Sequence, residues 1–338
     1  MKRLGARPII LCKPGSKLGE RAAGAGIEVR THPMRSNRDI SALLYAMKVI
    51  KEDSVDVVNT HSGDDSFICA IAGRLSARKP VIVRTRHLAL PITSKTTYSL
   101  FPHRVVTVSE FVRRYLVDEV GIPGNKVTAV ATGIDLARFD PSTVPDTLRA
   151  ELGVSPSTLI VGTVAILRRK KGHHVLLEAI PEILRECEGA LFVFAGDGPQ
   201  RENIEERIRD LGIGKSVRLL GLRKDIPTVL KGLDIFVLPT LQEALGTSIL
   251  EASAMRKPVI GTSVGGVPEA IRDGLTGLLV APEDSKGLAN AIIKLLKDAA
   301  LRRRMGDEGR AMVEAGYSTE KMVEKMHKVY TELLAARR

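Results

Sequence analysis

Two glutamates that lie eight positions apart at a predicted helix start have a spacing suited to ligand binding. Their segment follows a predicted strand, turns at a glycine and opens a helix, so two helical turns carry Glu251 along the same ligand as Glu243. The backbone N–H groups of Gly246, Thr247 and Ser248 face an anion at such a position. We therefore expect a phosphate at the helix start and hydroxyl groups at the two acids. The helix dipole alone also favours glutamates here, so an ordinary helix terminus is the alternative.

A cationic loop follows another predicted strand in the same half of the chain. Arg168 and Lys171 lie between a strand at residues 159–164 and a helix at 174–186. Both side chains neutralise phosphate charge, and arginine adds bidentate geometry. The loop therefore predicts a diphosphate site, with a solvated run of charges as the alternative.

Three polar side chains come at or after the ends of predicted strands in the first half. His61 follows the strand at residues 55–59, and Arg86 and His87 follow the strand at 81–84. Parallel strands end at the same edge of a sheet, so these side chains should line a ligand site. No spacing typical of metal ligands accompanies them, and we predict neither a metal nor a cofactor. Histidines that only hydrogen-bond at strand ends are the alternative.

Short β-branched runs alternate with longer helical patterns along nearly the whole chain. This alternation is typical of βα units, so the predicted fold class is α/β, with two doubly wound, Rossmann-like domains. The predicted strands cover residues 8–12, 55–59, 81–84, 104–108, 126–130, 159–164, 190–195, 216–220, 235–239, 259–262 and 278–280. The predicted helices cover residues 40–51, 109–120, 174–186, 201–211, 226–232, 247–255, 285–298 and 318–338.

The domain boundary is predicted where glycine and proline interrupt any long element, within residues 133–157. We expect an N-terminal domain over residues 1–138 and a C-terminal domain over 139–317. The last helix, 318–338, has an apolar stripe and must dock on another element. Packing back onto the N-terminal domain is one arrangement that it allows.

The charge balance narrows the choice of partners. Among 338 residues, 51 are Lys or Arg and 39 are Asp or Glu, a net charge of +12 that favours nucleotides, phospholipid headgroups or other anions. Trp is absent and aromatic residues make up 4%, which counts against a single-stranded nucleic-acid surface.

The composition also predicts a compartment. Three cysteines without a CxxC pattern fit a reducing environment, and no apolar run is long enough for a membrane helix or a signal sequence. We therefore expect a cytoplasmic protein, for which the positive charge leaves peripheral contact with an anionic membrane open.

Several motifs follow one another in a fixed order along the chain. They are residues 127–139 with Thr132-Gly-Ile-Asp135 and Phe139, then Lys171-Gly172, Ala195-Gly-Asp-Gly-Pro199, Gly221 with Asp225, Leu233 to Pro239, Glu243 to Glu251, Gly265-Gly-Val-Pro-Glu269 and Thr276 to Val280. Together they resemble the retaining nucleotide-sugar glycosyltransferases of family 4. The family has the GT-B architecture, two Rossmann-like domains facing across a cleft. The segments around His61 and His87 are similar to those of bacterial lipopolysaccharide and surface-polysaccharide glycosyltransferases.

The resemblance implies roles for the candidate residues. Glu243 would contact the donor sugar, Glu251 the nucleotide ribose and Lys171 the diphosphate. His87 matches the family's histidine near the donor sugar and the acceptor, and we predict Glu243 and His87 as catalytic. Arg168, Gly246, Thr247 and Ser248 complete the predicted donor site, and His61 and Arg86 the acceptor side.

The sequence departs from the family pattern at three places. The family's phosphate-binding arginine aligns with Ile166, so Arg168 would have to act from a shifted position. Ala244 replaces a glycine after the first acid. The family also has a strand, a glycine-rich loop and a helix before the strand at residues 8–12, so the N-terminal domain is expected to lack its first strand and helix.

These observations predict a hexosyltransferase or related glycosyltransferase. It would move a sugar from a nucleotide-diphosphate sugar to a cell-envelope glycan or lipid-linked acceptor, without a metal. The alternatives are a non-catalytic member that binds nucleotide or sugar, a nucleic-acid-binding protein and a sugar-nucleotide epimerase.

Overall fold

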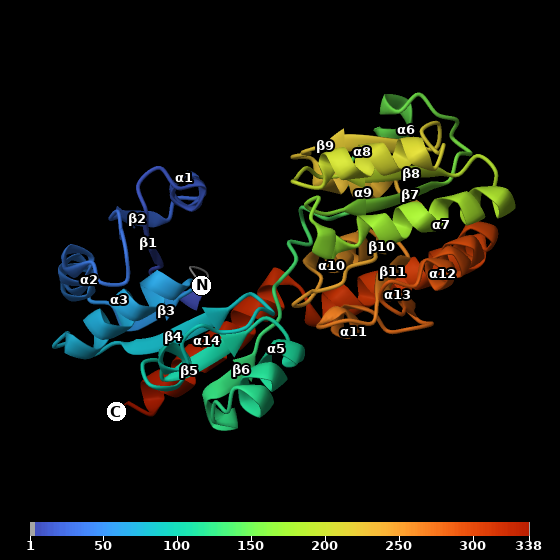
Figure 1. Ribbon diagram of the computed structural model, residues 1–338. Helices are drawn as coiled ribbons and strands as arrows, with labels where there is room; N and C mark the ends of the chain where they lie inside the picture. The colour runs from blue at the N-terminus through green and yellow to red at the C-terminus, as the bar shows by residue number, and fades with distance from the viewer. Residues whose placement is uncertain (1–3, 338) are drawn as a thin grey trace. The chain divides into compact units, whose positions relative to one another are not determined.

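The chain folds into two compact units. The computed structural model describes residues 4–337, apart from the side chain of Asp64. Unit 1 comprises Met1–Val130 and Val323–Arg338, and unit 2 comprises Ala131–Met322 (Figure 1).

The change from unit 1 to unit 2 comes at Val130 rather than at residue 138. The Val130 N–H donates to the Thr107 carbonyl oxygen in the sheet of unit 1. Four residues later, the Ile134 N–H donates to the Tyr317 carbonyl oxygen, and the Ile134 side chain is buried in the core of unit 2. The glycines and prolines that predicted the boundary therefore belong to the first turns of unit 2.

Unit 1 is built from parallel strands and connecting helices. Its elements are β1 (Ile9–Cys12), α1 (Lys17–Gly24), β2 (Glu28–Thr31), α2 (Ile40–Glu52), β3 (Val57–Thr60), α3 (Gly63–Leu75), β4 (Val81–Arg86), α4 (Thr96–Ser99), β5 (Arg104–Thr107), α5 (Glu110–Arg114), the π-helix Tyr115–Glu119, the 3-10 turn Gly124–Lys126, β6 (Val127–Ala129) and most of α14 (Thr319–Ala335). The strands form two hydrogen-bonded sheets, β1-β2 and β3-β4-β5-β6.

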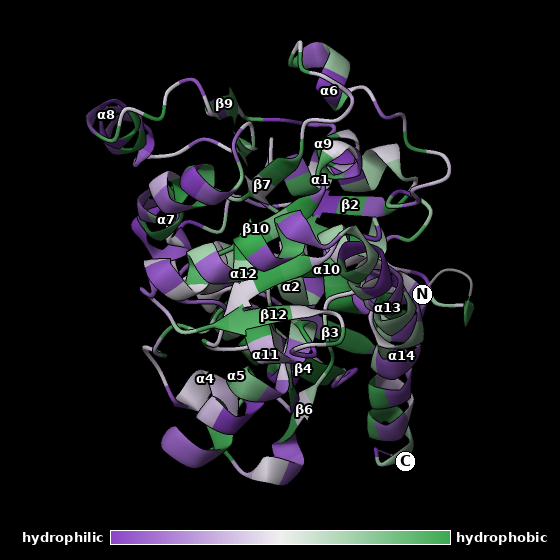
Figure 2. Cartoon of the chain, turned by 90° about the vertical axis from the view of Figure 1, so that its right-hand side faces the viewer, coloured by the Kyte–Doolittle hydropathy of each residue, from purple (hydrophilic) through white to green (hydrophobic). Residues whose placement is uncertain are grey.

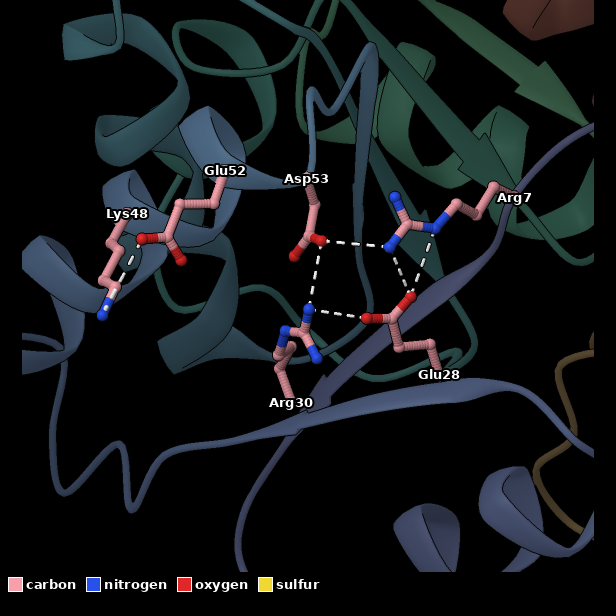
Figure 3. Close-up of polar contacts among 6 residues, drawn as sticks. All are labelled: Arg7, Glu28, Arg30, Lys48, Glu52 and Asp53. Carbon is pink, nitrogen blue, oxygen red and sulfur yellow. Dashed lines mark hydrogen bonds and ion pairs between the residues drawn. The ribbon is translucent and has the colours of Figure 1, made fainter.

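Charged side chains attach the β1-β2 sheet to the end of α2. Glu28 on β2 pairs with Arg7 and Arg30, each at 2.6 Å. The same two guanidinium groups donate to Asp53, the C-cap residue of α2, at 3.2 and 3.1 Å (Figure 3). Asp53 is the most enclosed member, because its side chain is only 7% exposed.

The C-terminal helix α14 runs beside the strands of unit 1 (Figure 1). The Asn59 amide on β3 donates to the Tyr330 hydroxyl at 2.9 Å, and Val329 is buried. The apolar stripe of the helix thus packs on the N-terminal part of the chain.

Unit 2 is a doubly wound α/β domain. Its elements are α6 (Leu148–Glu151), β7 (Ile160–Val164), a 3-10 turn (Arg169–Lys171), α7 (His173–Glu186), β8 (Leu191–Ala195), α8 (Arg201–Asp210), β9 (Val217–Gly221), α9 (Ile226–Gly232), β10 (Ile235–Leu238), α10 (Thr247–Ala254), β11 (Val259–Thr262), α11 (Val267–Ala270), β12 (Gly277–Val280), α12 (Ser285–Lys297) and α13 (Ala299–Gly316). The parallel strands have the order β9-β8-β7-β10-β11-β12. This is the Rossmann order, in which the winding reverses between β7 and β10.

Alternation along the strands builds two cores, one on each face of this sheet. On β7 and β10, Val161 and Val237 face the core shared with α7 and α12. Their neighbours Ile160 and Phe236 face the core shared with α9 and α10. The strands of unit 2 are accordingly coloured as hydrophobic, whereas α8 is almost entirely hydrophilic (Figure 2).

All of the predicted strands are present, but several elements were not predicted. The unpredicted elements of four or more residues include β2, α1, α3, α13 and the short helices α4, α6 and α11. β2 is an edge strand of four residues, Glu-Val-Arg-Thr, so it lacks the apolar run of a buried strand. α13 carries Arg302–Arg304, which the sequence marks only as a basic cluster.

We predict that Asp53→Ala lowers the free energy of unfolding by about 1–2 kcal/mol, because it removes a buried acceptor of two guanidinium groups. The control is Glu52→Ala, whose partner Lys48 lies 3.8 Å away and is well exposed, and which should change stability by less than about 0.5 kcal/mol. Urea unfolding of both variants measures the difference. Equal losses would contradict the assigned role of Asp53.

Candidate functional site

The loops after β7 and β10 meet at the point where the sheet of unit 2 reverses its winding. The Leu241 N–H and the Thr240 hydroxyl donate to the Lys170 carbonyl oxygen at 2.7 and 2.9 Å. Gly172 has a φ of +69°, and a Cβ atom there would lie 1.7 Å from the Pro239 carbonyl oxygen. Only glycine therefore lets the two loops approach this closely.

This approach brings Lys171 and Glu243 together. The Lys171 Nζ atom lies 2.5 Å from Glu243 Oε2, and each side chain is 17% exposed. Glu243 Oε1 accepts a hydrogen bond from the Ala244 N–H at 3.1 Å. The lysine predicted for a diphosphate and the acid predicted for a sugar thus form one ion pair.

A glycine pair after β11 packs against the Glu243 loop. A Cβ atom on Gly265 would lie 2.1 Å from the Glu243 carbonyl oxygen, and one on Gly266 would lie 2.0 Å from that of Ala244. The Gly266 N–H donates to the Glu243 carbonyl oxygen at 3.2 Å. The loop that carries Glu243 is therefore held by the loops after β7 and β11.

The first turn of α10 follows Glu243 closely in the sequence and supplies backbone N–H donors. Gly246 is the N-cap residue, with a φ of +92°, and no side chain caps the helix. The N–H groups of Thr247 and Ser248 have no intrahelical acceptor at this end, and the partial positive charge of the helix terminus favours an anion.

Glu251 lies farther along α10 in an enclosed position. Burial raises the pKa of its carboxyl group to about 7, and the positive charge of Arg138 opposes the rise. Within the described part of the chain, the carboxyl group has no hydrogen bond or ion pair of its own. An acid in this state is suited to hydroxyl groups of a ligand. Sequence reasoning missed Arg138, which lies in the 127–139 motif.

Arg168 and Lys171 take part in different contacts. The Arg168 side chain lines a small cavity with residues of α7 and α8, and Lys171 is not among the residues that line it. The predicted cooperation of these two residues at one diphosphate therefore stays a prediction.

In unit 1, the two predicted histidines lie together. His61 and His87 follow the neighbouring strands β3 and β4. His61 Nδ1 lies 2.9 Å from His87 Nε2, and the two rings are stacked with centroids 5.2 Å apart. Burial lowers the pKa of both rings, and His61 lowers that of His87 further. The neutral form of both rings is therefore favoured, and one ring donates its N–H to the other.

Asp65 holds the histidine pair in place from the first turn of α3. Its carboxylate accepts hydrogen bonds from the backbone N–H groups of His61 and Ser62 at 3.0 and 2.8 Å. Ser62 and Asp65 form a capping box, a spacing that could have predicted the start of α3 but was not used to do so.

Arg86 is engaged with the loop that follows it. Its guanidinium donates to the carbonyl oxygens of Leu88 and Leu90 and to the hydroxyl of the buried Tyr98. The arginine predicted for the acceptor side thus shapes a loop on which Leu88 is 52% exposed and Leu90 38% exposed.

Among the side chains that the structure describes, which exclude that of Asp64, no cluster of three or more His, Cys, Asp or Glu could hold a metal ion. Nor does the described part of the chain contain a helix long and apolar enough to span a bilayer.

Two family models together match most of the chain. The model "Glycosyltransferase Family 4" matches residues 1–138, and the model "Glycosyl transferases group 1" matches residues 145–312. The chain belongs to glycosyltransferase family 4. This family 4 chain is therefore a glycosyltransferase, and its matches extend over both units.

Curated relatives of this glycosyltransferase are named for different transfer reactions. It is 26% identical over 313 residues to the UDP-Gal:alpha-D-GlcNAc-diphosphoundecaprenol alpha-1,3-galactosyltransferase of Escherichia coli, covering 88% of this chain and 80% of the relative. It is 32% identical over 189 residues to the lipopolysaccharide core biosynthesis glycosyltransferase LpsE of Rhizobium meliloti, covering 56% of this chain and 53% of the relative.

Solved structures show the same architecture. A glycosyltransferase from Rickettsia africae superposes with a TM-score of 0.90 at 25% identity, covering 98% of this chain and 92% of that one. Anabaena HepE in complex with UDP and glucose superposes with a TM-score of 0.82 at 20% identity, covering 96% and 91%. The glycosyltransferase accordingly has the GT-B fold, with two parallel α/β, Rossmann-like domains.

We predict that Glu251→Gln removes a pH-dependent loss of stability. The folded chain holds the Glu251 proton more tightly than the unfolded chain, whose value is near the ordinary 4.5, so stability falls as the pH rises from 4.5 through about 7. We compare the free energy of unfolding of the variant with that of the native chain. This difference should be up to about 3 kcal/mol more favourable to the variant at pH 8 than at pH 4.5.

Denaturant unfolding at pH 4.5 and 8 measures this difference, with the exposed Glu202→Gln as the matched control. A stability difference between the variant and the native chain that is the same at both pH values would show that Glu251 does not carry a raised pKa.

Proposed function

We propose that this glycosyltransferase moves a hexosyl or related sugar, with retention, from a nucleotide-diphosphate sugar to an anionic, lipid-linked cell-envelope acceptor. The observation that carries the donor half is the Lys171–Glu243 ion pair at the switch point of unit 2. In a doubly wound sheet, ligands bind outside the carboxyl ends of the strands at this point.

The donor is assigned to the residues of unit 2 that this point brings together. Lys171 binds the diphosphate, and the N–H groups of Gly246, Thr247 and Ser248 add donors to it. Glu243, released from Lys171, accepts hydrogen bonds from the transferred sugar. Similar proteins support this donor class, since the Escherichia coli relative is named for UDP-Gal and Anabaena HepE was solved in complex with UDP and glucose.

The positive groups also explain how the bond to the leaving diphosphate breaks. Negative charge grows on the phosphate oxygens as the sugar departs, and preorganised donors that meet this charge lower the barrier. We assign this task to Lys171 and the helix α10 terminus. Glu251 accepts from the ribose hydroxyl groups, which favours its ionised form, so nucleotide binding near pH 7 releases a proton.

The acceptor is assigned to unit 1 because the charge of the chain is divided unequally. Unit 1 contains 25 Lys and Arg against 13 Asp and Glu, a net charge of +12. Unit 2 contains 26 of each and has no net charge. The whole positive excess of the chain thus lies on the unit that does not bind the donor, and it favours an anionic acceptor or membrane surface there.

Exposed leucines support an acceptor that carries a lipid. Leu88 and Leu90 lie directly after His87, on the loop that Arg86 holds through its carbonyl oxygens. Apolar side chains next to a histidine pair suit a substrate with both polar and aliphatic parts. We therefore propose peripheral contact of this loop with the cytoplasmic face of an anionic membrane.

The divided sheet of unit 1 favours a second candidate. Within the described residues, the β1-β2 sheet makes no ladder with β3, so the strands of this unit do not form one continuous sheet. A protein of this kind could bind the nucleotide sugar without transferring it. Product formation by the purified chain separates the two candidates.

We predict that Lys171→Ala weakens nucleoside diphosphate binding by about 30-fold, because a charge-assisted hydrogen bond to phosphate contributes about 2 kcal/mol. Calorimetric titration with UDP, GDP, ADP and CDP identifies the nucleotide, and the exposed Lys215→Ala is the matched control. Unchanged affinity in Lys171→Ala would rule out the proposed donor site.

We predict that His87→Ala separates transfer from donor binding. Loss of a group that positions reactants costs about 100-fold in transfer rate, whereas nucleotide affinity, which depends on unit 2, should stay within about twofold. The control is His327→Ala on α14. Transfer is followed with the identified donor and lipid extracts as acceptors. Full transfer by His87→Ala would remove this histidine from the site.

A further inference from the structure

A cavity lined by basic side chains lies between the start of α7 and helix α8 in unit 2. It is a cavity of about 50 Å³, the size of one small anion. Its lining residues come from the segment before α7, from the first turns of α7, and from α8 with its N-cap residue: Arg168, Arg169, His173, His174, Leu177, Gln200, Asn203, Ile204 and Arg207. Neither Lys171 nor Glu243 is among them.

His173 provides an observation that points to a ligand in this cavity. The side chain is only 3% exposed, yet neither ring nitrogen has a hydrogen-bond partner among the described residues. Burial lowers the pKa of the ring to about 4, Lys171 and His174 act in the same direction, and the nearby backbone of Arg168 opposes the fall, so the ring is neutral. A buried imidazole without partners is costly, and a ligand that accepts its N–H proton removes this cost.

The charges around His173 indicate the sign of that ligand. The side chains of Arg168 and Arg169 are exposed and form no ion pair within residues 4–337. Arg207 is already paired with Glu178, at 2.7 and 2.9 Å, so its charge is largely neutralised. Two arginines without an ion pair among the described residues thus line a cavity that has no Asp or Glu in its lining.

We propose that this cavity binds the phosphoryl group of a small anion, separately from the donor diphosphate. The neutral His173 donates one N–H, Arg168 and Arg169 supply the charge, and the Gln200 and Asn203 amides add donors. The N-terminus of the 14-residue helix α7 contributes its partial positive charge. A water molecule would satisfy His173 but would leave both guanidinium groups without a counter-charge.

Such an anion would also act on the donor site through the backbone. The segment that carries Arg168 and Arg169 continues into Lys171, and its Lys170 carbonyl oxygen is bonded to the loop after β10. An anion that fixes this segment at one end therefore stabilises the position of Lys171 at the other.

The test uses inorganic phosphate with the full chain, at constant ionic strength in sodium chloride. The native chain and three variants are compared: Arg169→Gln, Lys171→Ala and, as a matched control, Arg303→Gln on α13. We expect phosphate to raise the melting temperature of the native chain, Lys171→Ala and Arg303→Gln alike, and to leave that of Arg169→Gln unchanged. The melting temperatures without phosphate confirm that each variant is folded, and Asn203→Ala replaces Arg169→Gln if that variant is not.

Three outcomes would overturn the proposal. They are no phosphate effect on the native chain, an effect that survives in Arg169→Gln, and an effect that is lost in Lys171→Ala and so belongs to the donor site. Glucose 1-phosphate is measured in parallel. If glucose 1-phosphate raises the melting temperature as much as phosphate does, the ester part remains outside the cavity. If glucose 1-phosphate has no effect, only the free anion enters. Nucleotide titrations test the donor site separately, so a failure of one assignment does not imply a failure of the other.

Discussion

The hydrogen bonds that the Lys170 carbonyl oxygen accepts from Thr240 and Leu241 hold the site of unit 2 together. They fasten the loop after β7 to the loop after β10 at the point where the winding of the sheet reverses. Because Gly172 has no side chain, the loops come close enough for Lys171 and Glu243 to form an ion pair. Each group of the pair neutralises the other, and under the proposed function a diphosphate competes with Glu243 for the lysine.

The two units differ in net charge and in the apolar side chains that they expose. Unit 2 has no net charge and a sheet covered on both faces by apolar cores. Unit 1 carries the entire net charge of +12 and a loop with exposed leucines. Its candidate site is the His61–His87 pair, next to which the Asp65 carboxylate accepts a hydrogen bond from the His61 backbone N–H. This difference between the units fits the proposed transfer of a sugar to an amphiphilic acceptor.

Periodicity predicted every strand of the described chain except β2, because buried parallel strands are continuous apolar runs. It failed at β2, a polar edge strand, and at the boundary, where Ile134 belongs to the core of unit 2. Spacing predicted Glu243, Glu251 and Lys171 as site residues, but pairing between side chains depends on tertiary contacts. Spacing therefore could not predict three features of the structure: the ion pair of Lys171, the ring of His173 without a hydrogen-bond partner, and the contacts of Arg86 with its own loop.

The central claim is that Lys171 exchanges Glu243 for the diphosphate of the donor. A crystal structure of the chain with the nucleoside diphosphate selected by titration tests it most directly. We expect Lys171 Nζ within hydrogen-bond distance of a phosphate oxygen, the Glu243 carboxylate freed from the lysine, and the ribose hydroxyl groups on Glu251. A nucleotide bound away from the loops after β7 and β10, with the Lys171–Glu243 pair intact, would contradict the account.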